Sequence, residues 1–127
     1  MLDELQAFLD AAALPVTTVV GLFPATPYTC VALVERDSVN PSQPIFSGSR
    51  VTYPRVELLS RSVNYSLARL NLDLVAGRLT SIANQVIGDT LYLSSDLAAL
   101  PAWVGPADDD AGDVLAAELE LARVESV

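Results

Sequence analysis

The stretch that decides the fold is residues 50–79, RVTYPRVELLSRSVNYSLARLNLDLVAGRL. Residues 51–60 are rich in β-branched, aromatic and aliphatic side chains, which predicts a half-buried strand. Pro54 cannot donate a ladder hydrogen bond, so we expect it near the start of that strand or at a sheet edge. After Ser62 the apolar residues recur at helical spacing, and Ser62 or Asn64 can cap the helix. A strand that feeds a helix packed on its own sheet predicts an α+β fold.

The predicted helix carries an apolar stripe that should face the sheet. Its members are Tyr65, Ala68, Leu72, Val75, Ala76 and Leu79, widened by Leu67, Leu70 and Leu74. For Tyr65 we favour packing at the helix start over a contact with another molecule.

The segments before this stretch add one helix and two strands. Residues 1–13 predict an amphipathic helix, because leucines recur on one face and acidic residues open it. Residues 16–23 and 29–35 predict short strands rich in Val and Thr. The second strand is apolar on both faces, which is typical of a central strand, and its Cys30 is expected to be a buried, inert thiol.

The segments after it are less regular. We expect residues 82–87 to be irregular or a short strand, residues 90–93 to be a strand after the turn at Gly88, and residues 94–100 to form a short helical turn. Residues 102–113 are predicted to form a loop. In it, we expect Trp103 to cover the core, in preference to serving as an anchor for a contact with another molecule. Together these segments predict one domain over residues 1–127, with a mixed or antiparallel sheet of about four to five strands, an N-terminal helix and one main helix.

Residues 37–49, DSVNPSQPIFSGS, are the most loop-like part of the chain. Long loops are often functional or ordered by a partner. Ile45 and Phe46 are apolar residues within this loop. Two interpretations remain open: the loop packs on its own domain, or it docks on a neighbouring subunit.

The composition of charged residues excludes several classes of function. Sixteen acidic residues face seven basic ones, all arginine, and the net charge is −9. Without His or Lys there is no Ser-His-Asp or Cys-His catalysis, no His-ligated metal, no Schiff base and no P-loop. A pair of carboxylates remains possible in principle. The shortage of cations makes the chain a poor binder of duplex DNA.

Hydropathy is high, with 51% hydrophobic residues and a mean hydropathy of +0.39. No apolar run reaches the roughly 18 residues of a membrane span, and the N-terminus lacks the basic region of a secretory signal. We therefore expect a soluble product, with some excess apolar surface in a subunit interface or in a dense core.

An acidic turn follows Pro106. Asp108, Asp109, Asp110 and Asp113 suggest a calcium loop, but the sixth position is Asp113 and the twelfth is Leu119, where an EF-hand has Gly and Glu. The turn is therefore interpreted as a solvated loop, or as a carboxylate surface that DNA passes without binding. The segment 114–127 that follows has strong helix propensity, yet it also alternates as an edge strand does.

The residues quoted above, taken in order, resemble a known family. PYTCVALVE at 27–35, YPRVELLSRSVNYSLAR at 53–69 and the helix that follows resemble the tail terminator, or tail completion, proteins of long-tailed bacteriophages. The matching positions are Pro54, Arg55, Val56, Arg61, Asn64, Tyr65, Ala68 and Arg69, followed by Pro101, Gly105 and the aspartates 108–110. The resemblance implies that residues 114–127 are a strand, against their helix propensity, although they are richer in Ala, Glu and Leu than the family pattern.

The resemblance implies a structural virion protein that is no enzyme and needs no cofactor. Such a protein assembles as a ring, usually of six copies, at the head-proximal end of the tail tube, in the cytoplasm of the host bacterium. The implied partners are further copies of itself, the tail tube protein and a head-neck connector or stopper protein; DNA passes through unbound and no membrane is involved.

For such a ring, candidate subunit contacts or structural ion pairs are Arg55, Arg61 and Arg69, with Ile45 and Phe46 as apolar contacts. Candidates for an acidic lumen or a connector-facing loop are Asp108, Asp109, Asp110 and Asp113. The alternatives are another virion joint protein, such as a head-completion or tube-like protein, an acidic DNA-mimic adaptor, and a His-free carboxylate enzyme.

Overall fold

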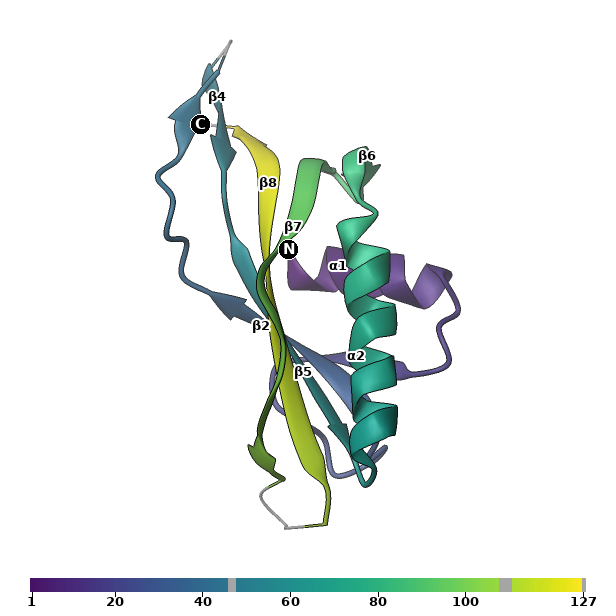
Figure 1. The fold of residues 1–127 in the computed structure, drawn as a ribbon. Coiled ribbons are helices and arrows are strands. Elements are labelled where there is room, and N and C mark those ends of the chain that lie inside the picture. The colour runs from purple at the N-terminus through teal and green to yellow at the C-terminus, as the bar shows by residue number, and fades with distance from the viewer. Residues whose placement is uncertain (46–47, 108–110, 127) are drawn as a thin grey trace.

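The computed structural model describes residues 1–45, 48–107 and 111–126. Two helices lie on one side of a long, curled sheet (Figure 1). The elements are α1 (Leu2–Ala11), β1 (Thr17–Val20), β2 (Cys30–Arg36), β3 (Gln43–Pro44), β4 (Ser49–Thr52), β5 (Arg55–Ser62), α2 (Tyr65–Thr80), β6 (Ala83–Ile87), β7 (Thr90–Pro106) and β8 (Asp113–Ser126). The α+β class and the two helices are as predicted.

The sheet is mixed, because β1 pairs with β2 in parallel and the other pairs are antiparallel. Its main path runs β1-β2-β5-β8-β4-β3, and β7 pairs with the other edge of β8 and with β6. Within the described residues it has eight strands, more than the four to five predicted. The additional strands arise where Pro54 divides one predicted strand and where predicted loops pair with a neighbour.

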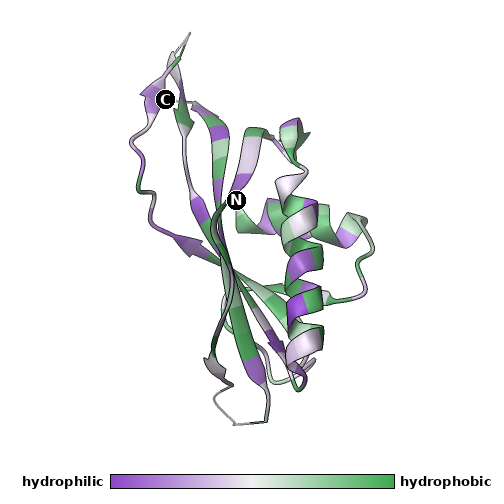
Figure 2. Cartoon of the chain, viewed as in Figure 1, coloured by the Kyte–Doolittle hydropathy of each residue, from purple (hydrophilic) through white to green (hydrophobic). Residues whose placement is uncertain are grey.

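The core lies between the helices and the sheet. Its sheet side is formed by β5 and β8, along which buried and partly exposed side chains alternate. Val56 and Leu58 point to the helices and are fully buried, while Arg55 and Glu57, which alternate with them, are partly exposed. On β8, Leu115, Ala117, Leu119 and Leu121 are buried in the same way. Figure 2 shows hydrophobic residues along β8 and on α2, with hydrophilic bands on successive turns of α2. The strand implied for residues 114–127 is confirmed over β8, because partners on both edges of a strand override helix propensity.

Helix α2 begins where predicted. Asn64 Oδ1 accepts a hydrogen bond of 3.2 Å from the backbone N–H of Leu67, as an N-cap does. Ala68, Leu72, Val75, Ala76 and Leu79 are buried as predicted. Tyr65, the first residue of α2 after its N-cap, is not: it is about half exposed, so its place in the stripe that faces the sheet was wrong. Leu67 and Leu70 are also exposed.

Strand β2 has the two-sided burial predicted for a central strand. Cys30, Val31, Ala32 and Leu33 are all fully buried, between β1 and β5. Burial raises the pKa of the Cys30 thiol, although the neighbouring Arg61 guanidinium lowers it in part. A protonated, buried thiol is unreactive, as expected for this residue.

Strand β7 corrects two predictions. Residues 94–100 form no helical turn, and residues 102–106 are not a loop: both belong to one strand of 17 residues. It follows β8 with several register shifts, so bulges replace the helical turn that local propensity suggested. Trp103 does not cap the core; it is about half exposed, and its Nε1 donates to Asp113 Oδ1 at 3.0 Å.

The predicted loop 37–49 is partly wrong as well, since it contains β3 and reaches the start of β4. We call β3, β4 and residues 123–126 of β8 the arm; it projects from one end of the sheet, beside the C-terminus (Figure 1). At its base, the carbonyl of Pro54 accepts from the N–H of Leu121 at 2.9 Å, so β8 runs past the break between β4 and β5. Pro54 therefore stands between two strands instead of inside one.

Candidate assembly surfaces

One face of the sheet is left uncovered by both helices, and we call it the open face. On it, Arg55 pairs with Glu118 at 3.1 Å and with Glu120 at 3.3 Å. Glu120 also accepts from Asn40 Nδ2 at 2.7 Å, which connects the segment between β2 and β3 to β8. Because Glu57 and Glu118 are directly opposite, the pairing of Glu57 with a second arginine, Arg36, relieves their repulsion. Arg55 is thus engaged in its own chain.

Arg61 is also engaged in its own chain, but through a different chemistry. Its guanidinium lies 4.7 Å from the Phe23 ring centroid and 4.4 Å from that of Tyr28. It donates to the carbonyls of Tyr28 at 2.7 Å and of Pro24 at 2.5 Å. No ion pair is seen for Arg61 among the described residues; it instead holds the segment 21–29 against the open face.

The remaining predicted contact residues lie apart from these two. Arg69 is exposed on α2 and pairs with Asp73 one turn later, at 3.2 Å. Ile45 follows β3 in the arm and is 45% exposed. Phe46 lies outside the described residues. The structure therefore does not gather the predicted contacts into one patch, and their role between subunits stays a prediction.

The predicted acidic surface is described only in part. Asp108, Asp109 and Asp110 lie outside the described residues, and Asp113 accepts from Trp103 as noted above. In the described ranges no group of three or more Cys, Asp or Glu side chains could hold a metal ion. Nor does any helix there have the length and apolar character that a membrane crossing needs.

The free edge of β7 is the most exposed apolar feature of the sheet. Strand β6 pairs with β7 only as far as Ser94, so residues 95–106 have no backbone partner on that edge among the described strands. The exposed large side chains along it are Leu97, Leu100, Trp103 and Val104, and Leu100 is 75% exposed. Sheet edges of soluble proteins are usually blunted by charge, yet Asp96 is the one charged residue here. Such an edge is typical of a surface that another chain covers.

A groove on the open face adjoins this edge. Its walls are Leu22, Phe23, Leu59, Arg61, Val104, Pro106, Ala107 and Val114. Leu22, on its rim, is 94% exposed, which is unusual for so large an apolar side chain. Groove and edge together form one apolar surface at the end of the sheet away from the arm.

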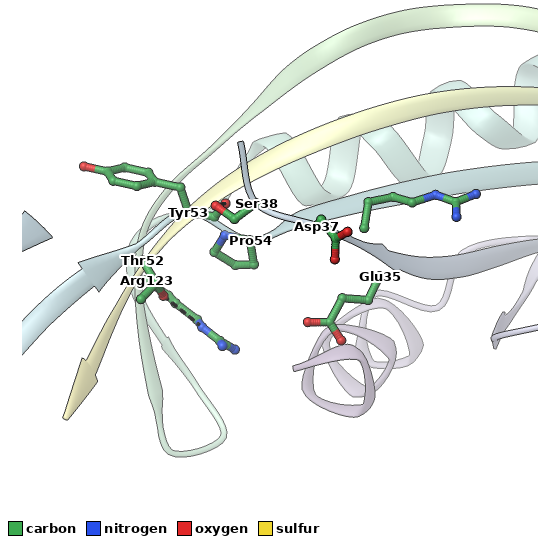
Figure 3. A pocket seen from close by; sticks show the side chains of 8 residues that line it. Glu35, Asp37, Ser38, Thr52, Tyr53, Pro54 and Arg123 are labelled. Carbon is green, nitrogen blue, oxygen red and sulfur yellow. Dashed lines mark hydrogen bonds between the residues drawn. The ribbon is translucent and has the colours of Figure 1, made fainter. Parts of the chain in front are cut away.

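A second recess lies where the arm leaves the sheet. Figure 3 shows Glu35, Asp37 and Ser38, at and just beyond the end of β2, facing Thr52, Tyr53, Pro54 and Arg123 from the other side. Arg123 Nε donates to Thr52 Oγ1 at 3.4 Å, and Ser38 Oγ donates to the carbonyl of Tyr53 at 2.6 Å. This recess is open and polar, unlike the apolar, enclosed sites that bind small molecules.

One polar cluster around Glu4 connects α1 to the β6–β7 turn. Glu4 accepts from Thr90 Oγ1 at 2.9 Å, from the N–H of Asp89 at 3.1 Å and from Tyr92 OH at 3.1 Å. Burial alone would raise the pKa of Glu4, but these hydrogen bonds together lower it below its usual value. Burial and the charge of Glu4 raise the pKa of Tyr92 to about 12.

We therefore expect Glu4→Gln to lower the free energy of unfolding by about 1 kcal/mol near neutral pH. A carboxylate whose pKa is lowered in the folded chain stabilises it above the unfolded pKa, and this contribution is lost as the pH falls through the folded pKa. The difference between wild type and variant should therefore shrink on acidification, in urea titrations at pH 7 and below pH 4. Asp3→Asn, an exposed residue in the same turn, should change little; an equal loss from both variants would contradict the role of the cluster.

A family profile described as bacteriophage tail terminator protein matches residues 5–123. The chain belongs to this family. The resemblance drawn from the sequence is thereby confirmed, and the tail terminator family places the chain among structural components of the phage virion tail.

The fold of this tail terminator is also found in a solved particle. A chain in the virion of a native gene transfer agent superposes with a TM-score of 0.57 and 16% identity, over 96% of this chain and 84% of that chain. At that identity the likeness supports the fold alone. No curated protein sequence matches.

Sequence reasoning missed the free edge of β7 and the groove beside it. The signal was present in residues 97–104, LAALPAWV, an apolar run with no charge. Because proline and small residues dominate this run, its composition predicts a turn and a loop. Only the pairing with β8 shows that these side chains lie along an exposed edge.

Proposed function

We propose that this tail terminator protein forms a closed ring, of six copies, at the head-proximal end of the tail tube. The observation that carries the proposal is the free, apolar edge of β7. A ring needs two different complementary surfaces on each subunit, so that each contact leads to the next and the circle closes. The β7 edge provides one of them, and β1 forms the opposite edge of the sheet, with no further strand on its outer side among the described residues.

In this role the ring ends tube polymerisation and joins the tail to the head-neck connector. A surface that binds the last tube ring but does not repeat the tube's own end would stop further addition. The partners are accordingly the tail tube protein and a connector or stopper protein. Shape and self-association are sufficient for this work, so the protein needs no catalytic group and no cofactor.

The charge of the chain supports passage of DNA through such a ring. A cationic lumen would bind the genome at each phosphate, whereas a chain of net charge −9 with seven basic residues offers few such contacts. Of the three arginines that the structure places on the open face, Arg36 and Arg55 are paired with glutamates, and Arg61 is stacked between rings. We propose that DNA passes without specific binding.

The test is assembly of the purified chain, alone and with tail tubes, measured by mass photometry and negative-stain imaging. We expect rings at the tube end, and we expect Leu100→Lys to weaken ring formation at least about tenfold because it buries a charge in the β7 contact. Leu70→Lys is the matched control, since Leu70 is also exposed but belongs to α2 and not to the free edge. A chain that stays monomeric at high concentration and beside tubes would overturn the proposal.

A further inference from the structure

The two flanks of the sheet differ in charge. On one flank lie β1 and, in the arm, β3; on the other lie β6 and the free part of β7. Residues 38–53, which include β3 and β4, contain Arg50 and no acidic residue; Glu125 lies in the β8 part of the arm. The other flank has the reverse composition: between residues 79 and 107 there is no arginine, and Asp89 and Asp96 are exposed.

Arg50 has an unusual position among the seven arginines. The other six have an ion pair, a ring or carbonyl contact, or a side-chain hydrogen bond within the chain. Arg50 has none among the described residues. Glu125 stands opposite it on β8, but pairs with Arg123 at 3.7 Å instead. Arg50 is thus an exposed cation, available to another chain.

Strand β8 shows which part of the other flank lies level with Arg50. Arg123 of β8 pairs with Thr52 of the arm on one edge and with Tyr92 of β7 on the other. Two residues further along β8, Glu125 pairs with Arg50. On the other edge the pairing with β7 begins at Arg123, and Thr90 and Asp89 come two and three residues before Tyr92 in the chain. If the ring axis runs along the strands, neighbouring subunits meet flank to flank at equal height. Arg50 of one copy then faces Asp89 of the next.

Apolar side chains accompany both charges. Ile45 follows β3 in the arm, and its N–H donates to the carbonyl of Ser49, the residue before Arg50, at 2.9 Å. Val86, on β6 three residues before Asp89, is 65% exposed. The arm has little packing of its own, because Val51 is its one buried apolar side chain in β3 and β4. A small ribbon of strands is marginally stable in water, so a neighbouring surface would stabilise it.

We infer that the arm is the lateral contact between subunits, in which Arg50 pairs with Asp89 of the neighbouring copy and Ile45 packs against its Val86. This inference rests on the ring proposed above and names its contact. The complementary charges would also select the neighbour's orientation, since reversing one subunit brings like flanks together.

The test is a charge-reversal cycle on the purified chain, with the subunit association constant measured by mass photometry at low and high salt. Arg50→Glu and Asp89→Arg should each weaken association at least about tenfold, and the double variant should recover to within about threefold of wild type. Arg50→Lys keeps the charge and should assemble as wild type does. Thermal unfolding of each variant will show that the exposed substitutions leave the fold intact.

The outcomes separate this inference from the proposed function. Wild-type rings together with Arg50→Glu rings of unchanged stability would overturn the arm contact alone. A double variant no better than either single variant would do the same. A wild-type chain that never forms rings would overturn the proposed function, whatever the arm variants do.

Discussion

Replacing Gly112 with alanine is expected to lower the free energy of unfolding by about 3 kcal/mol. A Cβ at this position would lie 2.2 Å from the carbonyl oxygen of Ser62 and 2.8 Å from the hydroxyl of Tyr28. The first contact is with backbone at the end of β5, which cannot rotate away as a side chain can. The substitution must therefore separate the turn before β8 from β5, where Ser62 pairs with Asp113.

Gly77 provides the matched control, because the same chemical change should there have the opposite sign. It lies exposed inside α2, and a Cβ added to it meets no atom within 4 Å. Alanine is favoured over glycine inside a helix, so Gly77→Ala should raise the free energy of unfolding by about 0.5 to 1 kcal/mol. Urea titrations followed by circular dichroism measure both. A Gly112→Ala variant within about 0.5 kcal/mol of wild type would show that the turn yields easily.

Arg61→Ala should have the second largest effect, a loss of about 2 to 3 kcal/mol. The substitution removes two ring contacts and hydrogen bonds to carbonyls of the segment 21–29 at once. Those carbonyls would lose the hydrogen bonds from Arg61, and Phe23 and Tyr28 would lose their contact with the guanidinium. Hydrogen exchange of residues 21–29 should accelerate even under conditions in which the chain stays folded.

Two further variants separate charge from geometry at this position. Arg61→Lys keeps the charge but lacks the planar fork, so it should recover less than half of the lost stability. Arg69→Ala removes an exposed pair on α2 and should cost no more than about 0.5 kcal/mol. Equal losses from Arg61→Ala and Arg69→Ala would show that Arg61 is an ordinary surface residue.

Both large effects concern the same end of the molecule. Gly112 lies against Tyr28, which is one of the two rings that hold the Arg61 guanidinium. The apolar groove and the lower part of the β7 edge are built on this support. We therefore expect destabilising substitutions here to weaken assembly as well, whereas Leu100, Arg50 and Asp89 are exposed and their substitution should leave the fold intact.

The sequence by itself determined the two helices and the strands whose two faces differ. Alternation along residues 55–62 and the stripe Ala68, Leu72 and Val75 of α2 are local patterns that only one face can bury, and Asn64 caps the helix through an interaction within four residues. The sequence also determined the burial of β2, because side chains that are apolar on both faces of a strand require cover on both faces.

Only the tertiary structure decided β7, the arm and the state of β8. Residues 94–106 have the composition of a turn and a loop, and they are a strand because β8 offers a partner along its full length. Residues 114–125 favour a helix locally, yet β5, β4 and β7 pair with them from both edges. Such pairing joins residues far apart in the chain, and its hydrogen bonds and burial outweigh local preferences of a few tenths of a kcal/mol per residue. For the same reason the free edge that we propose to build the ring cannot be recognised before the sheet is assembled.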